Sequence, residues 1–150
     1  MTLEQYYQLA GIGTFIATAS IAAIAWWELN QLRVQSRTAF EDSLTDEYRK
    51  IMKYIPTDIW LGSELKALEE ERQQDCRDAI FRYIDLSNEQ AFLHEQGRVR
   101  PETWKIWREG ILYNMALHAF RDLWQEVMTK SPESFSFLRK IIPESNSPVR

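Results

Sequence analysis

The order of hydrophobic and polar positions separates one long apolar stretch from a series of amphipathic ones. The apolar stretch, Leu9–Trp27, has no charged residue over nineteen positions. As a helix it spans roughly 28 Å, close to the hydrocarbon thickness of a bilayer. Two tyrosines precede it and two tryptophans close it, as is typical of side chains at membrane interfaces. The pattern predicts a transmembrane helix at 9–27, after a short extracytoplasmic tail at 1–8.

Two other interpretations of this stretch compete with a membrane anchor. One is a cleavable signal peptide, because Ala23-Ile24-Ala25 resembles a cleavage site, although no Lys or Arg precedes Arg33. The other is a buried helix of a soluble protein. Since Arg33 and Arg37 follow the stretch closely, the positive-inside rule predicts a single-pass protein of the cell inner membrane, with its N-terminus out and its C-terminus in the cytoplasm.

Small residues recur along the predicted membrane helix at a spacing of four. Such spacing lets helix backbones approach closely in lipid, where packing drives association. A high alanine content is the competing explanation. The pattern predicts a homo-oligomer whose packing residues in the membrane are Gly13, Thr14, Ala17, Thr18 and Ala22.

After the anchor, apolar residues recur at steps of three and four as far as residue 55. This pattern predicts an amphipathic stalk helix over 28–55 that continues the membrane helix. Charged residues, Glu41 among them, are placed mostly off its apolar face. A break near Thr38 or Thr45 stays open, and Pro56 ends the segment because proline disfavours helical geometry in the preceding residue.

The segment 56–142 is predicted to be a cytoplasmic helical domain with two long amphipathic patterns. The first predicted helix begins at a Ser63 cap and stops at Gly97. The second begins at Pro101 and continues without a break to Lys130. Their apolar faces must cover one another, which predicts a helical bundle.

Shorter features complete this domain. The connector before the first long helix is apolar, and its Ile59, Trp60 and Leu61 are expected to plug the core. Gly110 costs about 1 kcal/mol inside a helix, which close packing against another helix would explain. A last helix is predicted from a Ser131 cap with Pro132 at its first position, and 143–150 is a flexible tail.

No stretch alternates with period two for long, so the fold class is all-α.

Charge and candidate chemistry narrow the function. Residues 28–150 contain 18 basic and 21 acidic side chains, so 18 − 21 gives a charge of −3, which disfavours duplex nucleic acid as a partner. Cys76 is the only cysteine, which suits a reducing compartment. His94 and His118 are not spaced as metal ligands on a helix. The sequence also lacks nucleophile and phosphate-loop motifs, so we expect no enzyme, catalytic residue, metal or cofactor.

One cluster of residues suggests an anionic ligand. Basic and tryptophan side chains gather where the second long helix begins, and free backbone N–H groups at a helix start favour an anion. Arginine binds phosphate through two hydrogen bonds, and tryptophan offers a stacking surface for a base. The alternative is that the tryptophans belong to the core and the basic residues form a solvated flank. The residues are Arg98, Arg100, Trp104, Lys105 and Arg108.

The run Phe81–Val127 resembles an uncharacterised family of small bacterial proteins. The shared plan is an aromatic-rich helix, a turn at a glycine in the position of Gly97, and a helix that contains tryptophan. The resemblance implies one N-terminal membrane helix followed by a cytoplasmic helical domain. It implies no functional residues.

These observations favour a membrane-anchored interaction or scaffold protein. Such a protein would oligomerise in the bilayer and present its helical domain to a cytoplasmic protein partner. The alternative is a ligand-gated membrane effector, as in phage defence, whose cytoplasmic domain senses a nucleotide ligand. The residues leave both classes open.

Overall fold

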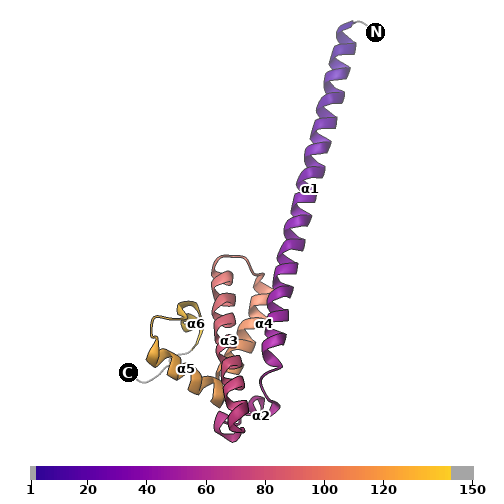
Figure 1. The fold of residues 1–150 in the computed structure, drawn as a ribbon. Coiled ribbons are helices and arrows are strands. Elements are labelled where there is room, and N and C mark those ends of the chain that lie inside the picture. Colours follow the sequence, from indigo (N-terminus) through magenta and orange to yellow (C-terminus); the bar gives the residue numbers. More distant parts are fainter. Residues whose placement is uncertain (1–2, 143–150) are drawn as a thin grey trace. The chain divides into compact units, whose positions relative to one another are not determined.

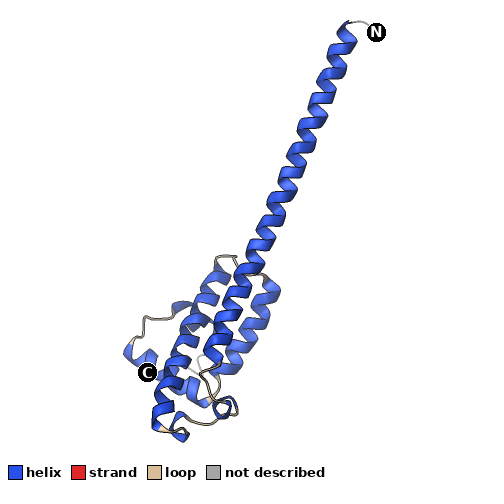
Figure 2. Ribbon diagram, turned by 45° about the vertical axis from the view of Figure 1, so that its right-hand side comes forward, coloured by secondary structure: helices blue, strands red, loops and turns tan. Residues whose placement is uncertain are grey.

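The computed structural model describes residues 3–142, apart from the side chains of residues 5–13 and 16. Every regular element in this part is helical, which confirms the predicted all-α class (Figure 2). The predicted flexible tail at 143–150 lies outside the described residues. The first helix begins at Leu3, so the described part of the predicted tail at 1–8 is helical.

The chain divides into two compact units, Met1–Ala39 and Phe40–Arg150. Helix α1, Leu3–Met52, belongs to both. It has no break at Thr38 or Thr45. Each hydroxyl donates to the carbonyl oxygen four residues earlier in the same helix, at 3.1 and 3.0 Å, and so does not cap a new one. The predicted stalk is therefore divided between the two units, and α1 ends three residues before its predicted end.

In the first unit the described side chains have no tertiary cover. Each one from Ala17 to Arg37 is exposed, including large apolar residues such as Ile21 and Trp26. Among the described residues, no helix combines the length and the apolarity that crossing a membrane requires. Gly13, one of the predicted packing residues, lies outside the described side chains.

The second unit is a helical bundle around one apolar core. Its central helix is α3, Glu70–Glu95, around which the shorter helices η1, α4, α5 and α6 pack (Figure 1). The C-terminal part of α1 supplies Leu44 and Ile51 to the core. The most deeply buried side chains include Trp124, Phe120 and Ile80. After α1, the elements are α2 Thr57–Trp60, η1 Leu65–Ala67, α3 Glu70–Glu95, α4 Pro101–Met115, α5 His118–Lys130 and α6 Ser136–Ile141.

The connector after α1 was expected to plug the core, and Ile59 does so. Its side chain is fully buried and lies in α2. The neighbouring Trp60 is half-buried and donates its indole N–H to the carbonyl oxygen of Ile55 at 3.3 Å. Leu61, in contrast, is exposed.

The predicted helix start at Ser63 is wrong. Gly62 has a φ of 97°, and the backbone N–H of Ser63 turns back to the carbonyl oxygen of Asp58 at 3.0 Å. Leu65 and Leu68 then pack against the core, and Leu68 is extended, so α3 begins only at Glu70. The packing of these two half-buried leucines thus delays the helix by one short 3₁₀ turn. Its predicted end is confirmed, since Gly97 follows the helix with a φ of 67°.

The predicted helix from Pro101 to Lys130 is two helices. It starts at Pro101 as expected, but α4 ends at Met115 and α5 begins at His118. Leu117 is extended, with a ψ of 145°, and its N–H donates to the carbonyl oxygen of Asn114. The two helices bury side chains at the same spacing on either side of this break, so the periodicity concealed it.

The last helix also starts later than the sequence suggested. Its first residue is Ser136, and Phe135 before it has left-handed backbone geometry, with a φ of 55°. The predicted caps, Ser131 and Pro132, lie in the preceding turn. The cap comes from α3, where the side-chain oxygen of Asn88 accepts the backbone N–H groups of the second and third residues of α6, both at 3.1 Å.

Candidate binding site

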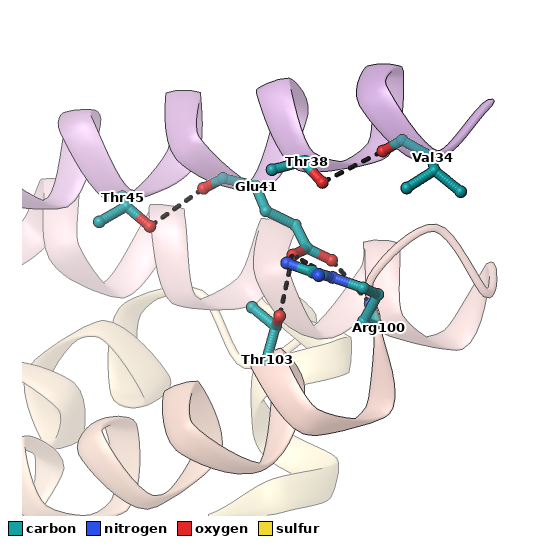
Figure 3. Close-up of polar contacts among 6 residues, drawn as sticks. All are labelled: Val34, Thr38, Glu41, Thr45, Arg100 and Thr103. Atoms are coloured by element: carbon teal, nitrogen blue, oxygen red, sulfur yellow. Dashed lines mark hydrogen bonds and ion pairs between the residues drawn. The ribbon is translucent and has the colours of Figure 1, made fainter. Parts of the chain in front are cut away.

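A buried carboxylate lies at the start of α4, where the sequence suggested an anion (Figure 3). Glu41 of α1 is 3% exposed. It accepts hydrogen bonds from the backbone N–H of Arg100 at 2.8 Å, from its guanidinium at 2.8 and 2.6 Å, and from the hydroxyl of Thr103 at 2.8 Å. The favoured position for an anion is thus filled by the protein itself.

These bonds keep the carboxylate ionised. Burial alone would raise the pKa of Glu41, but the hydrogen bonds from the side chain and backbone of Arg100 and from Thr103 outweigh it and lower the pKa below its ordinary value. The same pairing raises the pKa of Arg100. Glu41 was predicted to lie mostly off the apolar face of α1, which is wrong. Its buried position depends on a partner 59 residues away along the chain.

The other predicted ligand residues lie around this pair without forming one pocket. The guanidinium carbon of Arg98 sits 4.7 Å from the ring centroid of Phe40. Trp104 is buried and stacks on His94, with ring centroids 4.5 Å apart, as the core alternative predicted. Lys105 and Arg108 are exposed. Three of the five predicted residues therefore have partners within the bundle.

A cleft opens beside this network, between α1, α3 and α4. Its volume is about 290 Å³, near the lower limit for small-molecule sites. Among the residues that the structure describes, neither carboxylates nor cationic side chains line it. The lining residues are Thr45, Tyr48, Tyr83, Gln90, Ile106, Trp107, Gly110, Ile111 and Asn114.

Three polar side chains converge on the inner wall of the cleft. Asn114 is 6% exposed and donates its amide N–H to the hydroxyl oxygen of Tyr83 at 2.9 Å. Burial raises the pKa of Tyr83 well above its ordinary value, so the phenol keeps its proton. Gln90 is 5% exposed, and no hydrogen bond of its amide is found within residues 3–142. Its amide atoms are not among the fully buried unpaired polar atoms of these residues, so they keep contact with the cleft that Gln90 lines.

The outer edge of the cleft is apolar. Of the lining residues on α4, Ile106 is 70% exposed and Trp107 is half-buried. A Cβ atom added to Gly110 would have no neighbour within 4 Å. The expectation that Gly110 packs closely against another helix is therefore wrong within the bundle, because the residue faces open space.

Two candidate reactive features have ordinary roles. The thiol of Cys76 is fully buried, and burial raises its pKa to about 11, which leaves it unreactive. Glu126 receives hydrogen bonds from Arg77 and Lys130, which lower its pKa to about 2. Residues 3–142 contain no group of three His, Cys, Asp or Glu side chains that could hold a metal ion.

Sequence reasoning missed the polar residues of the cleft. Gln90 and Asn114 each interrupt the apolar face of a helix, between Ser87 and Ala91 in one case and between Ile111 and Met115 in the other. A polar residue at a core position is the pattern that could have revealed them.

Comparisons with known proteins do not add an identity. No family model matches the chain, and no curated protein or solved structure is significantly similar to it. The resemblance of Phe81–Val127 to a family of small bacterial proteins therefore stays a prediction.

Proposed function

We propose that this chain is a single-pass membrane protein that self-associates and presents its helical bundle to a cytoplasmic protein partner. The observation that supports it best is the exposure of α1 in the first unit. Every described side chain from Ala17 to Arg37 is exposed, and Ile21, Ile24 and Trp26 are 67%, 57% and 70% exposed. A helix with apolar residues on all sides requires lipid or other helices around it.

The sequence of the same segment favours lipid. Leu9–Trp27 is uncharged, and its length as a helix matches the hydrocarbon core. The aromatic residues at its ends suit the two interfaces, and Arg33 and Arg37 give the proposed orientation with the bundle in the cytoplasm. The hydroxyl of Thr18 donates to the carbonyl oxygen of Thr14 at 2.9 Å, which satisfies it within its own helix.

Self-association rests on the small residues of this segment. Ala17, Thr18 and Ala22 are exposed, so a second helix could approach the backbone closely along them. We place the oligomer contact there and leave the bundle free for its partner.

The alternative, a nucleotide-gated membrane effector, has less support. It needs free cations at the start of α4, whereas the guanidinium and backbone N–H of Arg100 both donate to Glu41. A nucleotide phosphate would have to displace a carboxylate that accepts four hydrogen bonds.

The test is to extract membranes of cells that produce the full chain at alkaline pH, and then to measure the mass of the detergent-purified protein by light scattering. We expect the chain to stay in the membrane pellet. The protein mass of the detergent-purified complex should be that of two or more chains of 17.8 kDa. A chain that remains a monomer in buffer without detergent would contradict the proposal.

A further inference from the structure

The cleft between α1, α3 and α4 has the features of a small-molecule site. It is mostly apolar, it has a few converging polar groups, and its volume is about 290 Å³. We propose that it binds an uncharged, planar heterocycle that carries a hydrogen-bond donor and an acceptor on adjacent ring positions. This site does not depend on the membrane anchor.

The amide of Gln90 identifies the polar edge of the ligand. Gln90 is 5% exposed, lines the cleft and has no hydrogen-bond partner among the described residues. A carboxamide presents one donor and one acceptor side by side, which matches adjacent complementary groups on a planar ring. A ligand with this edge would take the place of water at this amide and make both of its hydrogen bonds in the cleft.

The amide of Asn114 supplies a second polar contact. Its N–H is committed to the hydroxyl oxygen of Tyr83 at 2.9 Å, which fixes the orientation of the side chain. Its carbonyl oxygen remains as an acceptor, so this wall of the cleft favours a ligand with an N–H group.

The walls select a flat ligand. The rings of Tyr48, Tyr83 and Trp107 line the cleft, and aromatic faces stack favourably on planar rings. Gly110 leaves space where any other residue would project a side chain, since a Cβ there would meet nothing within 4 Å. This open wall offers a physical reason for a glycine inside α4.

None of the described lining residues is ionised, so the cleft favours an uncharged ligand over a charged one. A phosphate or carboxylate in the cleft would lose its hydration without gaining a cationic partner. Of the basic residues on α4, neither Lys105 nor Arg108 lines it. The ring itself, free or as part of a nucleoside, is therefore the expected determinant of binding.

The proposal can be tested by saturation-transfer NMR on the full chain in detergent micelles. The probes are uracil, which has adjacent N–H and C=O groups, and 1,3-dimethyluracil, which keeps the ring but lacks both N–H donors. We expect the Kd of uracil to be about 10-fold lower than that of the dimethyl analogue, because a tenfold ratio corresponds to the free energy of about one hydrogen bond. Equal binding of the two probes, or no transfer to uracil at millimolar concentration, would overturn the proposal.

Variants locate the binding. Gln90→Leu should weaken uracil at least about 10-fold, whereas Gln96→Leu, at the exposed end of α3, should leave it unchanged. Because a core substitution can unfold the bundle, Gly110→Leu gives an independent check. Position 110 is exposed, and the leucine side chain placed there should fill part of the cleft. Unchanged uracil binding in either cleft variant would show that the probe binds elsewhere.

A final comparison separates a nucleoside from a nucleotide. Uridine monophosphate should bind no more tightly than uridine, because no cation lines the cleft. A gain of about 10-fold or more from the phosphate would overturn the uncharged character of the site.

Discussion

The two units of the chain differ in the exposure of their large apolar side chains. In the first unit, Trp26 is 70% exposed and its apolar neighbours are exposed with it, whereas in the second unit Trp124 is 1% exposed in a closed core. Both units draw on the same helix, α1, whose apolar residues become buried only from Leu44 onward. The contrast teaches that a regular apolar pattern specifies a helix, while the partner of its apolar face depends on what else is present.

Charges placed in the exposed apolar segment should have the largest effect. Lysine costs about 2.5 to 3.5 kcal/mol at the centre of a membrane helix and less toward its ends. Ile21 and Ile24 lie beyond the centre of 9–27, so the double variant Ile21→Lys, Ile24→Lys should lose several kcal/mol of membrane insertion, less than the roughly 5 to 7 kcal/mol of two central lysines. We expect it to leave the membrane pellet on alkaline extraction.

The matched control places the same charges outside the predicted span. Leu29 and Val34 are 57% and 55% exposed, in the same unit. The variant Leu29→Lys, Val34→Lys should stay in the pellet. Release of both double variants, or of neither, would show that the segment 9–27 is not the anchor.

A tryptophan pair tests the two environments by stability. Trp124→Ala should lower the free energy of unfolding by about 3 to 5 kcal/mol, because it leaves a cavity in the core. Trp26→Ala should change it by less than about 0.5 kcal/mol. Denaturant unfolding of the bundle, followed by circular dichroism in detergent, measures both. Equal effects of the two substitutions would contradict the division into a covered and an uncovered unit.

The indole of Trp124 refines this test. Its N–H is buried without a hydrogen-bond partner among the described residues. Trp124→Phe should therefore cost much less than the alanine variant, under about 1.5 kcal/mol, because only volume is lost. A cost similar to that of the alanine variant would indicate a hydrogen bond at this position.

The carboxylate of Glu41 tests how the bundle holds its part of α1. Glu41→Gln should destabilise the bundle by about 2 kcal/mol, since it weakens charge-assisted bonds to Arg100. Glu47→Gln, in an exposed i,i+3 pair with Lys50, should cost under about 0.5 kcal/mol. Comparable losses would mean that burial of Glu41 contributes little.

The same carboxylate gives stability a pH dependence. The folded-state pKa of Glu41 lies below its ordinary value of 4.5. Its contribution to stability is therefore complete above that value and is lost as the pH falls through the folded-state pKa. Urea melts below about pH 4.5 should show a smaller loss of stability in Glu41→Gln than in the wild type. Parallel loss in both proteins would exclude Glu41 as the source.

The smallest expected effect concerns two glycines. Gly110→Ala should stabilise the bundle by up to about 1 kcal/mol, because Gly110 lies inside a helix with free space around it. Gly97→Ala should destabilise it, because Gly97 has a φ of 67°. Thermal melts would measure both, and destabilisation by Gly110→Ala would indicate a close contact at that face.

Local rules predicted those parts of the fold that depend on neighbouring residues. Gly97 ends α3 and Pro101 begins α4 as expected, since a left-handed stop and a first-turn proline act within a few positions. The same rules failed where distant residues decide. The cap of α6 comes from Asn88 on another helix, and the turn η1 lies where Leu65 and Leu68 pack, partly buried, against the core.

The candidate sites show the same limit. Arg100 was expected at an anion-favouring helix start, but only tertiary structure brings the carboxylate of Glu41 to it and adds the hydroxyl of Thr103. The cleft required Gln90 and Asn114 to meet across two helices, and periodicity marks such residues only as polar exceptions on an apolar face.

Hydrogen exchange of the full chain in lipid nanodiscs, resolved along α1, tests the central claim most directly. An uncovered helix exchanges readily in water, whereas backbone amides in hydrocarbon do not meet water. We predict that amides of residues 17–27 exchange on the order of 100-fold more slowly than those of residues 29–37. Equally fast exchange of the two segments would contradict a membrane-anchored α1.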